Sequence, residues 1–300
     1  MGSAAGRVAK NALQPVVRAV RGAVASVRSP LFVPPGHYYS PVPSGEDVLR
    51  AITTVRNVPD LPGIDLREQS QRELAVTLSP MWADLPETAS SDWRYDPDNE
   101  MFCLADAAVC YSMVRDLQPG RVIEVGSGFS SALALDAADR NAGDTSFTFI
   151  EPYPDRLLGL LRPEDRNRCT LVRGKVQDVP VDTFDQLRSG DLLFIDSTHV
   201  SKAGSDVNYL FFDVLPRLAE GVIVHVHDIF WPFEYPVDWL REGRNWTENY
   251  LLRAFLTHNS AFEILLFSSW LWAFEPDLVR KALPAAAEHV PGSIWLRKTG

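Results

Sequence analysis

The sequence from residue 121 onward alternates between short apolar runs and segments of helical periodicity, and this alternation constrains the fold more than any other feature. Each run has only four or five residues, a length typical of a buried strand. Between two of the runs, apolar side chains recur at helical spacing from Val207 to Leu218. Buried strands that alternate with amphipathic helices predict a parallel sheet covered on both faces. The runs are 122–125, 147–150, 169–172, 192–195, 222–226, 264–267 and 293–296.

The first 105 residues lack this alternation, and we expect them to form an extension to a domain at 106–300. Within the extension, residues 45–117 read as mostly helical with a polar break at 90–99. Residues 1–30 carry five basic residues and no acidic one, and we interpret them as a helix that docks on the body or on a second subunit, which would make a homodimer. A membrane-surface helix and an organelle transit peptide are the alternatives.

Composition and net charge limit the classes of partner that the protein is expected to bind. The net charge is −10 and the isoelectric point is about 5.1, which disfavours a nucleic-acid substrate. No apolar run reaches the roughly 18 residues that a membrane helix needs, so no membrane partner is expected. The three cysteines are widely spaced and show no metal-type pairing, which is typical of reduced cysteines in a cytoplasmic protein.

A glycine turn follows the first apolar run. Gly126 and Gly128 allow the backbone to turn tightly and to approach a ligand closely. Ser130 or Ser131 can cap the next helix, whose free N–H groups attract an anion. Glu151 ends the second run and can accept hydrogen bonds from both hydroxyls of a ribose. Together these residues predict a nucleoside-binding site that suits either NAD or S-adenosylmethionine.

Two residues favour S-adenosylmethionine over NAD. The dinucleotide fingerprint requires a third glycine at position 131, where this chain has Ser131. Glu124 lies two residues before the first glycine, at the ligand end of its strand. A carboxylate there suits the ammonium group of a methionine moiety and would repel a pyrophosphate.

With these residues in place, the segment from Asp106 to Lys298 resembles the Rossmann-like (class I) S-adenosylmethionine-dependent methyltransferases. The resemblance implies an α/β fold with a doubly wound, seven-stranded, mostly parallel sheet that ends in a strand hairpin. It also implies that the glycine turn holds the methionine part of the cofactor, that Glu151 holds the ribose, and that residues after the third strand flank the adenine. The implied cofactor residues are Glu124, Gly126, Ser127, Gly128, Ser130, Ser131, Glu151, Pro152, Tyr153, Val176, Gln177, Asp196 and Ser197.

Three further motifs narrow the resemblance to a bacterial subgroup of small-molecule methyltransferases. They are PGHYYSP at 35–41, DSTH at 196–199 and HVHDIFWP at 225–232. The last two follow the fourth and fifth strands, where the resemblance places the reacting sulfonium. We therefore expect a general base among His199, Asp228 and His227, with His199 first, and a structural role for His225.

Metal binding is the alternative use of the same strand ends. Asp196 and Asp228 match two positions at which catechol-type methyltransferases hold magnesium, but His199 and His227 spoil an all-oxygen site. Two histidines and a carboxylate suit a transition metal better. We expect no metal, with Asp196 and Asp228 as the alternative ligands.

The acceptor site is expected to be aromatic. Its predicted residues come from a proline-rich N-terminal loop that we interpret as a lid and from the segments after the fourth and fifth strands. The predicted function is methyl transfer to a small, aromatic or largely apolar metabolite. An NAD-dependent oxidoreductase and a non-catalytic nucleoside-binding protein are the alternatives. The acceptor residues are His37, Tyr38, Tyr39, Asn208, Trp231 and Tyr235.

Overall fold

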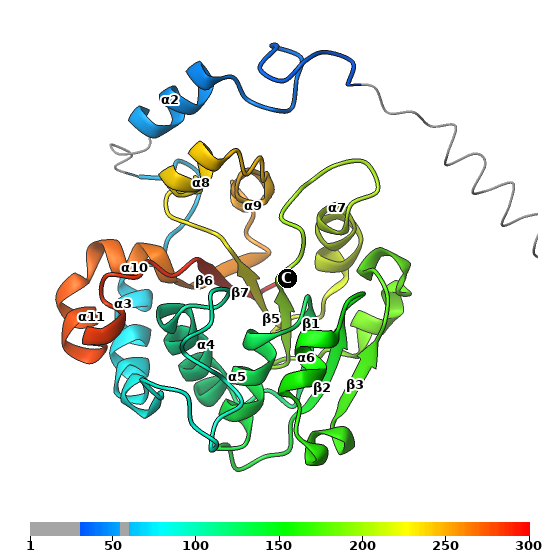
Figure 1. The fold of residues 1–300 in the computed structure, drawn as a ribbon, viewed down its shortest axis with the longest axis vertical. Helices are drawn as coiled ribbons and strands as arrows, with labels where there is room; N and C mark the ends of the chain where they lie inside the picture. Colours follow the sequence, from blue (N-terminus) through cyan, green and yellow to red (C-terminus); the bar gives the residue numbers. More distant parts are fainter. Residues whose placement is uncertain (1–30, 55–59) are drawn as a thin grey trace, which may run out of the picture. The chain divides into compact units, whose positions relative to one another are not determined.

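The computed structural model describes residues 31–54 and 60–300 (Figure 1). The chain divides into two compact units, Met1–Leu49 and Arg50–Gly300. The described part of the first unit consists of turns that lead into α2 (Gly45–Thr54). The predicted domain boundary between residues 105 and 106 does not coincide with this division.

A seven-stranded sheet forms the centre of the second unit, in the order β3-β2-β1-β4-β5-β7-β6. The strands from β3 to β5 pair in parallel, and β7 runs antiparallel between β5 and β6. The predicted doubly wound sheet and its terminal hairpin are confirmed, and every strand lies within two residues of its predicted run. The strands are β1 (Arg121–Val125), β2 (Ser146–Ile150), β3 (Cys169–Val172), β4 (Leu192–Ile195), β5 (Ile223–His227), β6 (Phe262–Phe267) and β7 (Ser293–Lys298).

Helices fill the connections between the strands. Helix α4 packs against α5, and α5 packs against α6. Helix α7 packs against the short turn Val176–Asp178, which follows β3. The predicted helix at 207–218 begins as α-helix and continues as a π-helical turn at Leu210–Val214 and a 3₁₀ turn at Leu215–Arg217. The remaining α-helices are α3 (Glu68–Leu78), α4 (Leu104–Leu117), α5 (Phe129–Ala138), α6 (Asp155–Leu160), α7 (Asp206–Tyr209), α8 (Val237–Glu242), α9 (Glu248–Leu256), α10 (Ser268–Phe274) and α11 (Pro276–Ala282).

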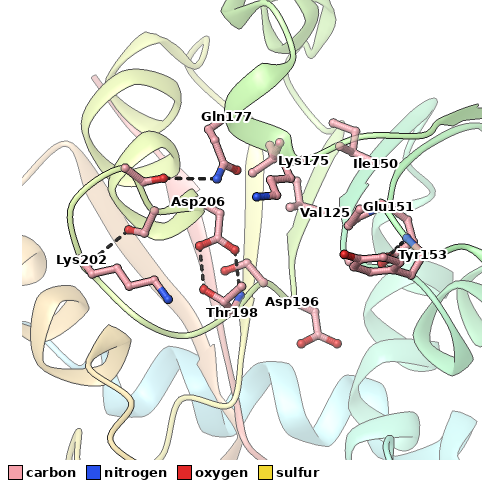
Figure 2. Close-up of a pocket in the computed structure, with 16 residues that line it drawn as sticks. Val125, Ile150, Glu151, Tyr153, Lys175, Gln177, Asp196, Thr198, Lys202 and Asp206 are labelled. Atoms are coloured by element: carbon pink, nitrogen blue, oxygen red, sulfur yellow. Dashed lines mark hydrogen bonds between the residues drawn. The ribbon is translucent and has the colours of Figure 1, made fainter. Parts of the chain in front are cut away.

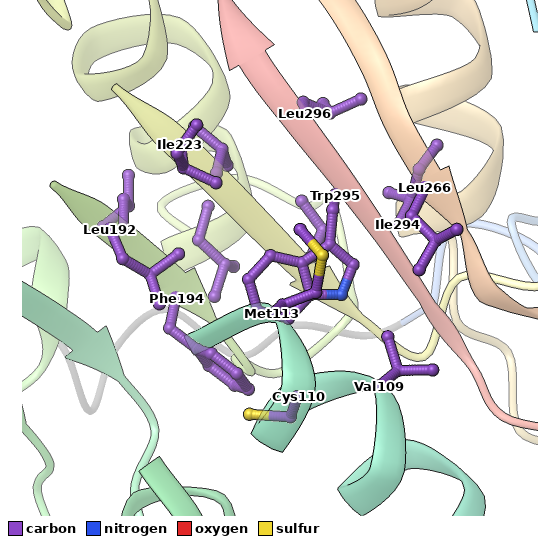
Figure 3. Close-up of a cluster of buried hydrophobic side chains, with 14 of the residues drawn as sticks. Val109, Cys110, Met113, Leu192, Phe194, Ile223, Leu266, Ile294, Trp295 and Leu296 are labelled. Atoms are coloured by element: carbon purple, nitrogen blue, oxygen red, sulfur yellow. The ribbon is translucent and has the colours of Figure 1, made fainter. Parts of the chain in front are cut away.

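Helix α4 covers the middle of the sheet (Figure 3). Its residues Val109, Cys110 and Met113 share one face of the helix and are at most 1% exposed. They lie against strand residues such as Phe194 and Trp295, which are at most 2% exposed. This packing holds β4, β5 and β7 together beneath the strand ends that carry the predicted site.

Residues 60–105 share the core of the second unit rather than standing apart from it. Trp82 is fully buried and its indole N–H donates to Ser112 of α4 at 3.1 Å. The polar break at 90–99 contains Arg94, whose side chain is 1% exposed and pairs with Asp136, Asp139 and Asp165 at 2.6–2.8 Å. A buried cation with three carboxylate partners ties this loop to α5 and to the segment before β3.

The predicted basic helix at 1–30, with its dimer, membrane-surface and transit-peptide interpretations, lies outside the described residues. Across 31–54 and 60–300, no helix has the length and apolar character needed to span a bilayer.

Candidate functional site

Two adjoining cavities open at the carboxyl ends of the parallel strands, with volumes of about 440 Å³ and about 350 Å³. Both are lined by Gly126, Glu151, Asp196, Ser197 and Thr198. Because these residues belong to both walls, one elongated ligand can extend from the first cavity into the second.

The first cavity joins apolar and polar walls (Figure 2). Ile150 ends β2 and Val176 follows β3, while Gln177 stands beside them. An apolar slot with a few polar groups at its edge suits a flat heterocycle such as adenine. Predicted cofactor residues brought together here are Gly126, Glu151, Pro152, Tyr153, Val176, Gln177, Asp196 and Ser197. Residues of this wall that were not predicted as ligands are Val125, Ile150, Lys175, Thr198, Lys202, Gly204, Ser205 and Asp206.

Glu151 is fixed by the backbone around it. Its carboxylate accepts hydrogen bonds from the N–H groups of Ser127 at 3.2 Å and of Tyr153 at 2.7 Å. These two bonds orient the carboxylate at the junction of the cavities and leave lone pairs for further donors. The geometry is that expected of a ribose-binding carboxylate.

Gly126 is glycine for a different reason than the sequence suggested. Its φ is +79°, and a Cβ built there would lie 1.8 Å from the backbone oxygen of Asp196. The close contact is therefore between the ends of β1 and β4, and any side chain would force them apart.

The second cavity contains the rest of the glycine turn together with the end of β5. Ser127, Gly128 and Ser130 line it on one side, and His199, His227 and Asp228 line it on the other. Ser131 lies behind this wall, where its hydroxyl accepts from the N–H of Gly128 at 3.0 Å and closes the cap of α5. The predicted catalytic residues and the predicted methionine-binding turn thus face one space.

Glu124 is buried beneath this wall, with 1% of its surface exposed. One carboxylate oxygen accepts from the hydroxyl of Ser130 at 2.6 Å, and the other has no hydrogen-bond partner among the described residues. Burial raises the pKa of Glu124 to about 8, although the nearby hydroxyls of Ser130 and Ser131 oppose the shift. A buried carboxyl with a free oxygen is prepared for a cationic partner.

His199 is held between three carboxylates. Its Nδ1 lies 2.9 Å from an oxygen of Glu248, and its Nε2 lies 3.4 Å from both Asp196 and Asp228. Burial lowers the pKa of His199, but hydrogen bonds to Asp196 and Glu248 raise it well above its ordinary value. Both ring nitrogens are engaged, so His199 is placed to act as an imidazolium donor at neutral pH.

The segment Trp246–Glu248 holds His199 in place, and no local sequence pattern indicated this role. The backbone N–H groups of Thr247 and Glu248 both donate to the carbonyl of His199, at 2.9 and 3.1 Å. The Trp246 ring lies 4.5 Å from the imidazole and lines the second cavity. His199 and Asp228 both have positive φ values, 60° and 55°, a backbone strain that is concentrated at functional sites.

The two histidines of β5 differ in their surroundings. His225 is 1% exposed and stacks on Phe194 at 3.8 Å, and burial lowers its pKa well below the ordinary value. It is a neutral core residue, as predicted. His227 lines the cavity, and although burial lowers its pKa, Asp228, Asp196 and other carboxylates raise it overall.

Asp196, His227 and Asp228 each offer a ligand atom, and these atoms all lie within 4.8 Å of one another. Burial raises the pKa of Asp228, whereas the nearby His227 and His199 lower that of Asp196 to about 2. Two carboxylates and one imidazole match the mixed donor set of a transition-metal site better than an all-oxygen magnesium site.

Several predicted acceptor residues lie elsewhere. Trp231 packs against Phe267 and Phe274, and neither Trp231 nor Tyr235 lines the two cavities. Asn208 is likewise outside them, because its side chain bonds to Ser201 and Lys202. The aromatic lining comes instead from Phe102, Phe129 and Trp246. His37, Tyr38 and Tyr39 stack on one another in the first unit, and their predicted lid role stays a prediction.

Part of the chain matches a protein-family model and a protein of known sequence. A family model described as a methyltransferase domain matches residues 123–229, from β1 to the end of β5. An uncharacterised protein of Archaeoglobus fulgidus is 34% identical over 164 residues, which are 51% of this chain and 73% of that protein.

Two solved structures are also similar. The O-methyltransferase TomG from Streptomyces achromogenes, solved in complex with SAM, is 15% identical with a TM-score of 0.42, over 85% of this chain and 96% of that chain. The SAH-bound methyltransferase PaMTH1 of Podospora anserina is 16% identical with a TM-score of 0.40, over 86% of this chain and 98% of that chain. At these TM-scores neither structure decides anything about the present site.

The family match spans the strands that build both cavities, and the sheet has the seven mostly parallel strands and the terminal hairpin that the resemblance implied. Residues 123–229 thus contain a methyltransferase domain, and the sheet has the fold of the Rossmann-like (class I) S-adenosylmethionine-dependent methyltransferases.

Proposed function

We propose that the protein transfers the methyl group of S-adenosylmethionine to a small acceptor in the second cavity. The observation that carries the proposal is the pair of joined cavities, one with an apolar slot and the other with a His/Asp cluster. The methyltransferase-domain match over residues 123–229 disfavours an NAD-dependent oxidoreductase and a non-catalytic nucleoside-binding protein.

The residues present fit the methyl donor. Glu151 is oriented for the ribose, and the slot beside Val176 suits the adenine. The free oxygen of Glu124 and the unpartnered, buried hydroxyl of Ser127 lie at the turn where the methionine end would bind. Orphaned buried polar atoms cost free energy unless a ligand satisfies them, so these two support a polar occupant.

The acceptor is proposed to be small and largely aromatic or apolar. The second cavity has a volume of about 350 Å³ and includes the rings of Phe102, Phe129 and Trp246. A planar acceptor between such rings would meet His199 and Asp228 at one end of the cavity. The bacterial small-molecule subgroup is consistent with these dimensions.

The chemistry requires an in-line displacement and removal of one proton. The acceptor atom bonds to the methyl carbon, the carbon–sulfur bond breaks, and the sulfur keeps the electron pair to give S-adenosylhomocysteine. Because both nitrogens of His199 already engage carboxylates, we place the acceptor's proton on Asp228. His199 then orients Asp228 and balances its charge.

Donor binding tests the proposal first. Calorimetry with S-adenosylmethionine and S-adenosylhomocysteine should show one site per chain, and failure of both to bind at millimolar concentration would refute it. Incubation with methyl-labelled donor and metabolite extracts, followed by mass spectrometry of labelled products, then identifies the acceptor and the methylated atom.

A substitution at the cluster tests the role of its histidine. His199→Gln retains an amide that can donate to Glu248, so we expect an unchanged donor Kd and a kcat lowered about 10²-fold. The matched control is His289→Gln at an exposed position, which should leave both constants unchanged. A normal kcat in His199→Gln would remove His199 from the reaction.

A second candidate is transfer assisted by a divalent cation at Asp196, His227 and Asp228, favoured by the proximity of their ligand atoms. Such a cation would stabilise an ionised acceptor oxygen. Turnover after exhaustive chelation, with manganese, iron(II) or magnesium added back, distinguishes the two candidates. Full activity in the chelated protein excludes the cation.

A further inference from the structure

Arg156 lies across the glycine turn. It belongs to the first turn of α6 and lines the second cavity together with Gly128 and Phe129. A Cβ built on Gly128 would lie 3.0 Å from Cδ and 3.6 Å from Nη1 of Arg156, and the guanidinium carbon is 5.8 Å from the centre of the Phe129 ring. Among the residues that the structure describes, its guanidinium forms no hydrogen bond or ion pair.

This contact explains the second glycine of the turn. Gly128 has an extended φ of 171°, which any residue can adopt, so its conformation does not demand glycine. What a side chain at 128 would displace is the arginine stem. The missing Cβ therefore makes room for the guanidinium directly over the turn.

The turn also begins α5, a helix of ten residues. The first N–H groups of a helix lack intrahelical acceptors and favour an anion. A second observation points to a ligand here, because the fully buried Glu124 keeps one carboxylate oxygen unpartnered and the Ser127 hydroxyl is buried without a partner. A cation, a helix N-terminus and a separate buried carboxyl match a zwitterion, whose two charges need opposite partners.

We infer that Arg156 and the first turn of α5 bind the α-carboxylate of the methyl donor, while its ammonium group is held on the side of Glu124. The inference rests on the proposed function, since it assigns one end of the donor proposed there. Arg156 thereby selects donors and products that retain the amino-acid end. An acceptor with its own carboxylate could use the same guanidinium, and the experiment separates the two sources.

The experiment compares two ligands on the full-length protein by calorimetry. S-adenosylhomocysteine carries the amino-acid end, and 5′-methylthioadenosine has the same adenosyl thioether without it. Arg156→Gln should raise the Kd of S-adenosylhomocysteine about 10–100-fold, as expected for loss of a charge-assisted hydrogen bond. The Kd of 5′-methylthioadenosine should stay within about twofold of the wild-type value. The Kd of S-adenosylhomocysteine for Arg156→Lys should fall between those of the wild type and Arg156→Gln, because lysine keeps the charge and loses the bidentate geometry.

Arg166→Gln is the charge-matched control. Arg166 is exposed and lines neither of the two cavities, so its substitution should change neither Kd. An unchanged Kd for S-adenosylhomocysteine in Arg156→Gln overturns the inference, as does equal weakening of both ligands. A raised KM for the acceptor alone also overturns it and assigns the guanidinium to the acceptor. If the wild-type protein binds neither ligand, the proposed function fails as well, which is a distinct result.

Discussion

Donor binding should depend on pH through Glu124. Glu124 is 1% exposed, and burial raises the pKa of its carboxyl to about 8. At neutral pH Glu124 is therefore mainly protonated before a ligand binds. The hydroxyl of Ser130, which lines the cavity, donates to this carboxyl and connects it to the turn. An ammonium group bound at the turn favours the carboxylate, so binding releases the proton.

The size of the effect follows from the ionised fraction. With a pKa of about 8, roughly 1% of Glu124 is ionised at pH 6 and about half at pH 8. If the complex contains only the carboxylate, the affinity for S-adenosylhomocysteine rises about 50-fold over this range, or about 2.3 kcal/mol. The affinity therefore increases with pH and levels off above pH values of about 8.

Calorimetry at pH 6, 7 and 8 in buffers of different ionisation enthalpy measures both the affinity and the proton release. At pH 7 we expect about 0.9 proton released for each ligand bound. The isosteric variant Glu124→Gln has no proton to lose and should bind more weakly at pH 8 with a flat profile. A flat profile in the wild-type protein, or the same slope in Glu124→Gln, would refute the reasoning, and the second result would assign the proton to another group.

Three further outcomes follow from the packing. Gly126→Ala should lower the free energy of unfolding by about 3 kcal/mol, because its φ is strained and its Cβ would clash with backbone. Gly128→Ala should melt at the wild-type temperature and should weaken ligand binding as the loss of Arg156 does. Equal melting temperatures of the two variants would contradict this. Arg94→Met should cost about 3–5 kcal/mol in urea unfolding without changing donor affinity, since it leaves the buried Asp136 without its ion-pair partner and leaves Asp165 with Arg168 alone. Because the folded pKa of Glu124 exceeds its ordinary value of 4.5, its contribution to stability falls as pH rises from about 4.5 to about 8, and Glu124→Gln should lose less stability over that window.

The sequence by itself determined the strands of the sheet and which residues follow their carboxyl ends. A strand buried on both faces must be apolar at nearly every position, so runs such as 147–150 and 192–195 mark their own ends. The ligand edge of a parallel sheet follows each strand directly. Glu151 and Asp196, which follow the second and fourth strands, line both cavities.

Only the tertiary structure decided the surroundings of these residues. Glu248 pairs with His199 across 49 residues, and Trp246 replaces the predicted Trp231 in the cavity wall. No local pattern encodes where a long connection returns, because that depends on which face of the body its apolar residues cover. The same packing decided that Gly126 accommodates a neighbouring strand rather than the ligand, and it placed Arg156 over the turn. Local periodicity thus fixed the strands, and long-range packing fixed the charges around the reacting atoms.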